Sequence, residues 1–412
     1  MYQQNEIIKI VFVDICSIPI SFDVDWADLS QKVEIIFLDT NDVDEREDIL
    51  IKSGTVYGFN GFSNPFSILN DNNIIVGILA KHGFTSNEAI IVTADYEHLE
   101  YFSNYNIKCV HLTRKRYNYK IAPDYICHDV KALDDIITGK NGGFFAEAIM
   151  ENEIKDKYFY LLKNNCEVDG KVFPIWAGGR YFAQGTAQAH YHLLSSKIIS
   201  NKRDGREFIS FSKIFYKMIT NYINLNENLV VTAVPPKPGK KNRFNRVLDN
   251  ICQHLKIENG INYLYCNEDY GNNKIRGAQD RIKSLDGVFS LAHNVNVKGR
   301  DVVIIDDVLA SGATIKEIAK ILFEAGVNSV TAFVIGINQL TSQWRNVRFI
   351  PLKCPICGGE LNLRINNRNL TPFYGCENYP NCRYTMNYDD GYKKIKEQNI
   401  MRAIDTGEGV EF

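Results

Sequence analysis

The sequence contains no apolar run long enough to cross a membrane. None of its hydrophobic stretches approaches the roughly 18 residues that a bilayer-spanning helix needs. The N-terminus, MYQQNEIIKIVFVD, has no basic segment followed by an apolar core and a small-residue cleavage site, so no secretory signal is predicted. Internal repeats and low-complexity tracts are also missing. These absences predict a cytoplasmic protein that does not contact membranes.

Length and composition fit a globular protein of several domains. The 412 residues are 45% hydrophobic and 23% charged, which is an ordinary balance, and this length is typical of two or three domains. The formal net charge of −2 hides an uneven distribution, because acidic residues outnumber basic ones by 21 to 12 in residues 1–140. A polyanionic partner is therefore expected to bind elsewhere in the chain.

The ten cysteines are unevenly distributed. Six are scattered through the first 266 residues, whereas Cys354, Cys357, Cys376 and Cys382 lie within 29 residues. In a cytoplasmic chain this pattern favours reduced thiols and a metal site over a disulfide framework.

Two α/β segments precede the cysteine-rich tail. In residues 1–140, short apolar strands alternate with helical stretches, which predicts a domain with a parallel sheet. The sequence GKNGG at 139–143 ends this pattern. Residues 141–340 are predicted to form a second α/β domain, with a hairpin turn at Asp169–Gly170 and helices near 187–200, 211–223, 247–255 and 315–325. Residues 341–412 form a third, polar segment that carries the clustered cysteines.

The stretch VVIIDDVLASGAT, residues 302–314, has the chemistry of a ligand site. Its β-branched residues predict a buried strand, and ligands bind at the carboxyl ends of strands in open α/β sheets. Asp306 and Asp307 lie at that end, and small residues then turn into a helix whose first N–H groups favour an anion. Carboxylates suit vicinal hydroxyls or a divalent cation, so a ribose 5-phosphate matches the whole stretch. The alternative is a Rossmann-like strand with an incidental Asp-Asp pair.

The same stretch resembles the signature of type I phosphoribosyltransferases, which use phosphoribosyl pyrophosphate (PRPP). The resemblance implies that Asp306 and Asp307 are the catalytic acidic pair, contacting the ribose hydroxyls together with Mg²⁺. It also implies that the following loop cradles the 5-phosphate. The loop residues are Ala310, Ser311, Gly312, Ala313 and Thr314.

Two further stretches, VVTAVPPKPGKKNRFNR (230–246) and RIKSLDGVFSL (281–291), are similar to the competence-protein ComF branch of that family. Basic side chains there would hold pyrophosphate, whose departure leaves an oxocarbenium-like sugar that is stabilised mainly by electrostatics. The basic candidates of the first stretch are Lys237, Lys240, Lys241, Arg243 and Arg246, and those near a lid are Arg276, Arg281 and Lys283. A solvated surface loop is the alternative for the first stretch.

The resemblance does not identify the acceptor. In this family a variable hood selects the nucleophile, and residues 145–190 are expected to supply it here. Some members bind PRPP only as a regulatory signal, so both an enzyme and a PRPP-responsive protein are considered.

The cysteine spacing predicts one structural Zn²⁺ site. Cys354 and Cys357 form one knuckle and Cys376 and Cys382 the other, so four thiolates close a tetrahedral coordination sphere. The surrounding sequence, CPICGGELNLRINNRNLTPFYGCENYPNCRYT, resembles the C-terminal zinc ribbon of type IA topoisomerases, which implies binding to single-stranded DNA.

Aromatic and basic residues of the ribbon are the candidates for nucleic-acid binding. Stacking rings interleaved with Arg side chains are the combination that single-strand binding uses. The candidates are Phe373, Tyr374, Tyr379, Tyr384, Arg364, Arg368 and Arg383. A ribbon that docks a protein is the alternative.

The first domain resembles the haloacid dehalogenase (HAD) superfamily through VFVDICS, IIFLDT and EAIIVTADYEHLEYFSNYNIKCVHL. The resemblance implies that Asp14 is the nucleophile position, that Thr40 binds phosphate and that Asp95 is a metal-binding acid. Cys16 and Leu99 stand where a second acid/base and a second metal ligand are usual. We therefore expect a degenerate domain that docks a protein partner or senses a ligand, with a plain flavodoxin-like domain as the alternative.

These features together predict a phosphoribosyltransferase in a nucleic-acid-associated setting, which transfers phosphoribosyl to an unknown acceptor and releases pyrophosphate. The alternative is a non-enzymatic, PRPP-responsive regulatory or defence protein that binds single-stranded DNA.

Overall fold

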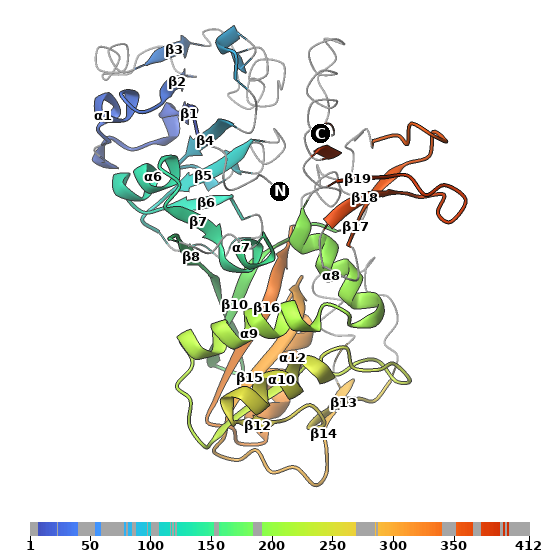
Figure 1. Ribbon diagram of the computed structural model, residues 1–412. Helices are drawn as coiled ribbons and strands as arrows, with labels where there is room; N and C mark the ends of the chain where they lie inside the picture. Colours follow the sequence, from blue (N-terminus) through green and yellow to red (C-terminus); the bar gives the residue numbers. More distant parts are fainter. Residues whose placement is uncertain are drawn as a thin grey trace.

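The chain forms two α/β parts, each built on a large β-sheet, and a small β-ribbon, as the computed structural model in Figure 1 shows. The structure describes residues 7–22, 24–39, 54–58, 78–79, 81–84, 88–96, 98–99, 107–115, 117, 119, 122–151, 156–183, 192–268, 285, 287–339, 352–365, 372–387, 390–391 and 394.

Six parallel strands form the first sheet in the order β3-β2-β1-β4-β5-β6. The strands are β1 (Ile10–Asp14), β2 (Glu34–Asp39), β3 (Thr55–Gly58), β4 (Ala89–Thr93), β5 (Lys108–Leu112) and β6 (Tyr125–Cys127). The short 3₁₀ turns η1 (Ile15–Ser17) and η2 (Ile20–Phe22) follow β1. The strand order reverses between β1 and β4, so the first sheet has the topological switch point of doubly wound folds. The predicted parallel α/β organisation is confirmed.

Alternation along β1 places its residues in two apolar clusters. Val11 and Val13 pack in one cluster with residues of α1 (Trp26–Ser30) and α6 (Val130–Ile137). Ile10 and Phe12 belong to the other, which continues into the second sheet. The two α/β parts therefore share buried apolar surface.

The second sheet has the order β12-β11-β15-β16-β10-β9. Its strands are β9 (Leu162–Val168), β10 (Lys171–Tyr181), β11 (Leu229–Ala233), β12 (Glu258–Asn259), β15 (Asp301–Leu309) and β16 (Ser329–Asn338). Only the pairing of β9 with β10 is antiparallel. Asp169 and Gly170 both have positive φ, at 49° and 76°, which is the backbone of a two-residue hairpin turn, so the predicted hairpin is confirmed.

Helices cover both faces of the second sheet. Residues of α7 (Phe145–Glu151), α8 (Leu193–Asp204), α9 (Phe208–Tyr222) and α10 (Asn245–Leu255) pack in one apolar cluster, and α12 (Ala313–Glu324) packs in the other. Two pairs of short strands lie outside this sheet: β7 (Asn141–Phe144) with β8 (Tyr158–Tyr160), and β13 (Leu264–Cys266) with β14 (Phe289–Leu291). The expected helices are all present, although α8 begins later than the sequence pattern predicted.

One expectation about this domain is wrong. Residues 145–190 were expected to form a hood over the site, but 162–181 fold into β9 and β10 of the second sheet. Phe173, Ile175 and Ala177 are buried in the shared cluster. This segment is framework, not hood, because its alternating apolar residues complete the sheet.

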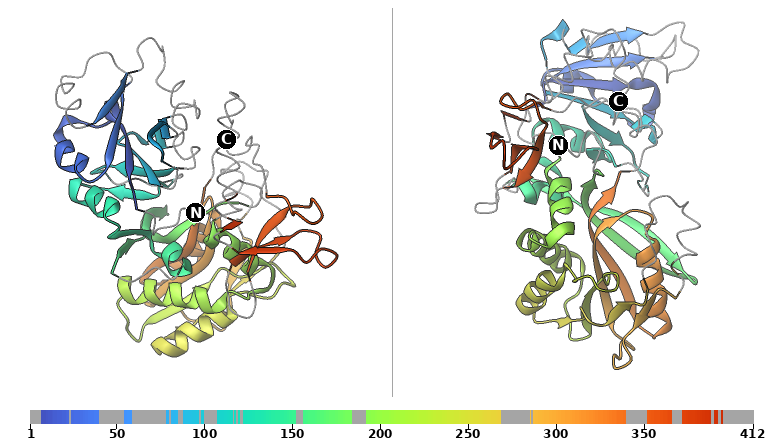
Figure 2. Two further views of the ribbon diagram at one scale, coloured as in Figure 1. Left: turned by 45° about the horizontal axis from the view of Figure 1, so that its top comes forward. Right: turned by 90° about the vertical axis from the view of Figure 1, so that its right-hand side faces the viewer.

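The ribbon is a three-stranded antiparallel sheet of β17 (Leu361–Ile365), β18 (Pro372–Cys376) and β19 (Thr385–Asn387). Its core is small and consists of Leu352, Leu361, Tyr374 and three of the cysteines. Strand β17 contacts α8. Figures 1 and 2 show the first sheet and the ribbon at the same end of the second sheet.

Among the helices within the described ranges, none combines the length and apolarity that crossing a bilayer requires.

Candidate active site and metal centre

Asp306 and Asp307 lie near the carboxyl end of β15, as the sequence predicted. Asp307 is buried, Asp306 is half-buried, and Asp306 Oδ1 accepts a hydrogen bond of 2.8 Å from the Asp307 backbone N–H. Burial, followed by repulsion from the Asp307 carboxylate, raises the pKa of Asp306 to about 7. The pair therefore needs a cationic partner to carry two charges at neutral pH.

Two basic side chains approach the acidic pair. Arg243 Nη2 donates to Asp307 Oδ2 at 2.7 Å and to Asp306 Oδ1 at 3.4 Å. Lys202 Nζ lies 4.0 Å from Asp307 Oδ2 and 4.6 Å from the centre of the Tyr181 ring. Arg243 was predicted from sequence, whereas Lys202 and Tyr181 were missed because no motif surrounds them and only the fold brings α8 and β10 to this point.

The loop after the acidic pair leads directly into α12. Gly312 precedes the helix with φ 75°, a conformation that glycine adopts without strain, and Ser311 Oγ accepts from the Ala313 backbone N–H at 3.4 Å. Ala310 and Ser311 are exposed, Thr314 is half-buried and Ala313 is buried. Since N–H groups in a first helical turn have no intrahelical partners, this loop suits a phosphate.

The other predicted basic residues differ in position. Lys237 is half-buried, whereas Lys240 and Lys241 are exposed in the loop between β11 and α10. Arg246 lies 3.5 Å above the ring of Phe208 and so packs on α9. Arg276, Arg281 and Lys283 lie outside the described residues.

The four clustered cysteines form a metal site. Their sulfur atoms all lie within 4.8 Å of one another, with 3.6 Å between Cys354 and Cys382 and 3.4 Å between Cys357 and Cys376. A tetrahedron with Zn–S bonds of about 2.3 Å would place its sulfurs about 3.8 Å apart. The donor set therefore fits Zn²⁺, with every coordination position taken by protein. The acidic pair, which offers only oxygen atoms, instead fits Mg²⁺.

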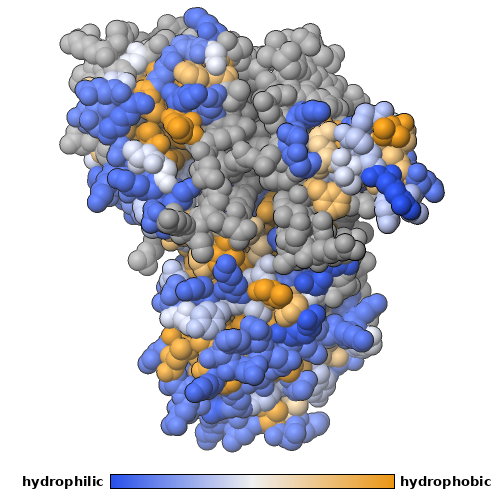
Figure 3. Space-filling model, in the orientation of Figure 1, coloured by the Kyte–Doolittle hydropathy of each residue, from blue (hydrophilic) through white to orange (hydrophobic). Residues whose placement is uncertain are grey.

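The ribbon exposes only some of the predicted aromatic residues. Tyr379 is 61% exposed and Phe373 and Tyr384 are half-buried, but Tyr374 is fully buried in the ribbon core, so its prediction as a stacking residue is wrong. The Tyr374 ring is the largest side chain of the small ribbon core. Arg383 is exposed, Arg364 lies in β17 with its backbone paired to Phe373, and Arg368 lies outside the described residues. The ribbon, at the right of Figure 3, carries apolar side chains beside hydrophilic ones.

The first sheet places Asp14 at the switch point between β1 and β4. Asp14 is 2% exposed, and its Oδ2 accepts from Thr93 Oγ1 at 2.8 Å and lies 2.6 Å from His98 Nδ1. His98 Nε2 is in turn 3.9 Å from Asp95 Oδ2. Leu99 is buried in the apolar core, Cys16 is half-buried, and Thr40 lies outside the described residues. No sequence motif indicates the contact of His98 with Asp14, which occupies the predicted nucleophile.

Two family models match this chain. Residues 254–354 match the phosphoribosyl transferase domain, and residues 352–391 match the topoisomerase DNA binding C4 zinc finger. The chain therefore contains a domain of the first family and a zinc ribbon of the second. The first match covers the acidic pair and its loop, and the second covers all four cysteine ligands.

Two curated relatives also match. A ribose-phosphate pyrophosphokinase from Saccharolobus solfataricus is 24% identical over 193 residues, which are 42% of this chain and 65% of the relative. Ribose-phosphate pyrophosphokinase 2 from Archaeoglobus fulgidus is 50% identical over 38 residues, 9% of this chain and 14% of the relative. The chain thus spans less than two thirds of the length of either protein.

Solved structures are only distantly similar. A hypoxanthine phosphoribosyltransferase from Staphylococcus aureus aligns with a TM-score of 0.23 and 15% identity, covering 34% of this chain and 76% of its own. The phosphoribosylpyrophosphate synthetase of Mycobacterium smegmatis aligns with a TM-score of 0.25 and 10% identity, covering 95% and 99%. Similarity at this level carries no functional argument.

Proposed function

We propose that residues 141–340 bind PRPP with Mg²⁺ and transfer its phosphoribosyl group to an acceptor, with release of pyrophosphate. The observation that carries the proposal is the acidic pair at the carboxyl end of β15, followed at once by the turn into α12. The carboxylates suit a ribose diol, and the helix N-terminus suits its 5-phosphate. Both features lie within the part of the chain that matches the phosphoribosyl transferase domain.

Basic side chains near the acidic pair supply positive charge for the pyrophosphate of PRPP. Arg243 pairs with both carboxylates, and its single positive charge offsets only one of them. When a sugar and Mg²⁺ take its place on the carboxylates, Arg243 turns to the pyrophosphate, as do Lys237 and Lys240 of the same loop. Bound Mg²⁺ would supply charge that offsets the departing pyrophosphate. Fixed positive charge near the leaving group lowers the barrier to cleavage because it stabilises the transition state more than the ground state.

Calorimetric titration of the full chain with PRPP and Mg²⁺ tests the binding step. Asp306→Asn with Asp307→Asn should abolish binding, because neutral amides hold neither Mg²⁺ nor a diol as well as carboxylates do. Asp301→Asn is the matched control, since Asp301 begins the same strand at its opposite end. Absence of binding by the wild-type protein, or equal binding by the double variant, would contradict the proposal.

We further propose that the ribbon binds single-stranded nucleic acid and so brings the transferase to it. The match to the topoisomerase DNA binding C4 zinc finger and the exposed side chains of Tyr379 and Arg383 support this. Fluorescence anisotropy with labelled oligonucleotides should show binding that weakens with salt. If oligonucleotide binding is absent or insensitive to salt, the ribbon more plainly serves to bind a protein.

Two other functions are compatible with a PRPP site. A non-enzymatic, PRPP-responsive regulatory or defence protein would bind PRPP without releasing pyrophosphate in the presence of any purine, pyrimidine or oligonucleotide. Synthesis of PRPP is suggested by the names of the two curated relatives. Incubation with ribose 5-phosphate and ATP, followed by detection of PRPP, separates synthesis from transfer.

A further inference from the structure

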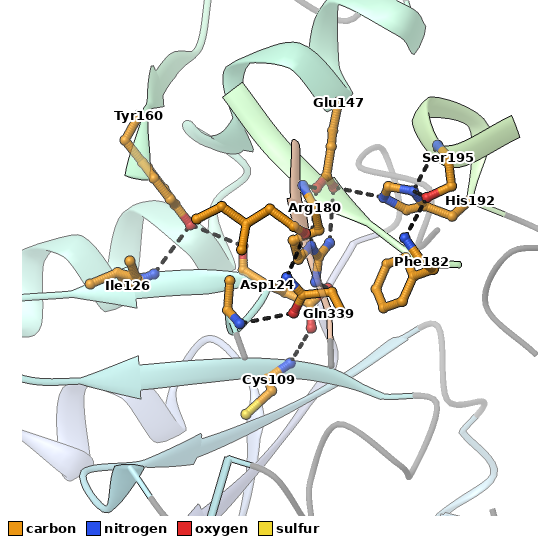
Figure 4. Close-up of polar contacts among 12 residues, drawn as sticks. Cys109, Asp124, Ile126, Glu147, Tyr160, Arg180, Phe182, His192, Ser195 and Gln339 are labelled. Carbon is orange, nitrogen blue, oxygen red and sulfur yellow. Dashed lines mark hydrogen bonds and ion pairs between the residues drawn. The ribbon is translucent and has the colours of Figure 1, made fainter. Parts of the chain in front are cut away.

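A buried charged network joins the first sheet to the second. Arg180, near the end of β10, donates from Nη1 to Asp124 Oδ1 at 2.7 Å, from Nη2 to Glu147 Oε2 at 2.9 Å and from Nε to Glu147 Oε1 at 3.0 Å (Figure 4). The side chains of Arg180, Asp124 and Glu147 are 7%, 11% and 2% exposed. Asp124 belongs to the first α/β part, whereas Arg180 and Glu147 belong to the second.

Backbone hydrogen bonds fix the geometry of this junction. Asp124 Oδ2 accepts from the Cys109 N–H at 2.7 Å, and the Asp124 carbonyl accepts from Tyr160 Oη at 2.9 Å. Gln339, just after β16, accepts from the Ala122 N–H at 2.9 Å. Because a buried charge that loses its partner is strongly unfavourable, such a network holds the two parts in one arrangement.

The junction lies at the same end of the second sheet as the acidic pair, where the parallel strands have their carboxyl ends. Strands β15, β16 and β10 are parallel, and Leu309, Ile337 and Arg180 are aligned across them. Neighbouring strands are about 4.8 Å apart, so Arg180 is about 10 Å from the end of β15. Figure 1 shows the first sheet above the ends of β10 and β16.

The basic loop and the junction flank β15 on opposite sides. The loop that carries Arg243 follows β11, which pairs with one side of β15, whereas β16 and β10 lie on the other side. In a displacement at C1 of PRPP the bond to the pyrophosphate oxygen breaks, a bond to the acceptor forms from the opposite side, and the acceptor loses its proton. If pyrophosphate leaves on the β11 side, the acceptor therefore enters on the side of β16 and β10.

We propose that the first α/β part, anchored through Arg180 and Gln339, forms the acceptor-side wall of the transferase site and excludes water from it. This inference rests on the proposed function. It gives the first part the role of the hood that residues 162–181, being strands of the sheet, do not provide. Tyr181 links the wall to the site, because it follows Arg180 in β10 and its ring lies under Lys202, which approaches Asp307.

Arg180 and Asp124 are positioning residues in this proposal, since they act through the wall and touch no substrate. A substitution that weakens the contacts of Arg180 or Gln339 with the first α/β part should let water reach the sugar of PRPP, while the PRPP contacts of β15 and α12 stay intact. Hydrolysis of PRPP should then rise, an effect that general destabilisation does not produce. Selectivity among acceptors should fall at the same time.

The test measures pyrophosphate release from PRPP without acceptor, and PRPP affinity by calorimetry, in the full chain. Asp124→Ala should raise water-driven release by about tenfold or more and change the affinity less than about twofold. Asp134→Ala is the matched control, because Asp134 lies in the same α/β part and pairs with Lys32 at the surface. Gln339→Ala removes two neutral hydrogen bonds, one from the Ala122 N–H and one to the Ile337 carbonyl, and serves as the second variant should Asp124→Ala not fold.

The outcomes separate the two proposals. Increased release in Asp124→Ala or Gln339→Ala, with Asp134→Ala like the wild type, supports the wall. Unchanged release, or release and affinity that fall together, overturns it while leaving PRPP binding established. Failure of the wild-type protein to bind PRPP would defeat the proposed function itself.

Discussion

Acidification should destabilise the second α/β part through His192, which folding keeps neutral. His192 is 1% exposed, and burial lowers its pKa from 6.5 to about 4, although the nearby Glu147 acts in the opposite direction. Its folded-state pKa lies below the unfolded value, so the unfolded chain takes up a proton first as the pH falls. Stability that is fully present above pH 6.5 is therefore lost progressively towards pH 4.

The size of the effect follows from the shift. A difference of about 2.5 pKa units, at 1.36 kcal/mol each, limits the loss of stability to about 3 kcal/mol, most of which is reached by pH 4. His192 Nδ1 caps α8 by accepting from the Ser195 N–H. His192→Asn keeps a capping acceptor but cannot take up the proton, so its stability should fall less steeply with pH.

Amide hydrogen exchange of α8 and β10 between pH 7 and pH 4 is the suitable assay, because it reports each part of a multi-domain chain separately. Local readout also matters because burial lowers the pKa of His111, in the first sheet, to about 4 as well. His254→Asn, which replaces an exposed residue of α10, is the control. The stability of this variant should change with pH as that of the wild type does. An identical pH dependence in His192→Asn would refute the reasoning.

Three further outcomes are expected. Cys376→Ser or a zinc chelator should unfold the ribbon, because so small a core depends on the metal, and should leave PRPP binding intact. Circular dichroism would show the unfolding and calorimetry the PRPP binding; loss of PRPP binding would contradict this. Tyr379→Ala should weaken oligonucleotide binding by about 1–3 kcal/mol if its ring stacks on a base, whereas Tyr374→Phe, in the ribbon core, should not weaken it. If anisotropy shows equal affinities for the two variants, or a weaker affinity for Tyr374→Phe, stacking by Tyr379 is contradicted. The first α/β part should hydrolyse no generic phosphomonoester, since Asp14 is held by Thr93 and His98; turnover that Asp14→Asn abolishes would show the opposite.

Local chemistry made some features predictable from sequence. The β-branched run before Asp306 and Asp307 specified a buried strand with carboxylates at its end, and the knuckle spacing specified the zinc ligands. Both signals are contained in a few consecutive residues. They therefore need no knowledge of which strands pair.

Features that depend on distant pairing were not predictable. Residues 162–181 are framework because β10 pairs with β16, about 150 residues later in the chain. Lys202 reaches Asp307 only because α8 packs beside β10, and Tyr374 is buried only because the ribbon closes around it. The resemblances to ComF proteins and to HAD enzymes remain predictions.

The pairing of β10 with β16 also dictates an order of events during synthesis. All six strands of the first sheet have been translated by residue 127, whereas β10, complete at residue 181, has no parallel neighbour until β16 is made at 329–338. At about 5–20 residues per second the ribosome needs roughly 10–30 s to cover that gap. Throughout this interval the β9–β10 hairpin presents an unpaired edge, the kind of surface that chaperones protect and that aggregates when left bare. A nascent chain stalled between 181 and 329 should therefore contain a folded first sheet followed by a hairpin that is prone to aggregate through its unpaired strand.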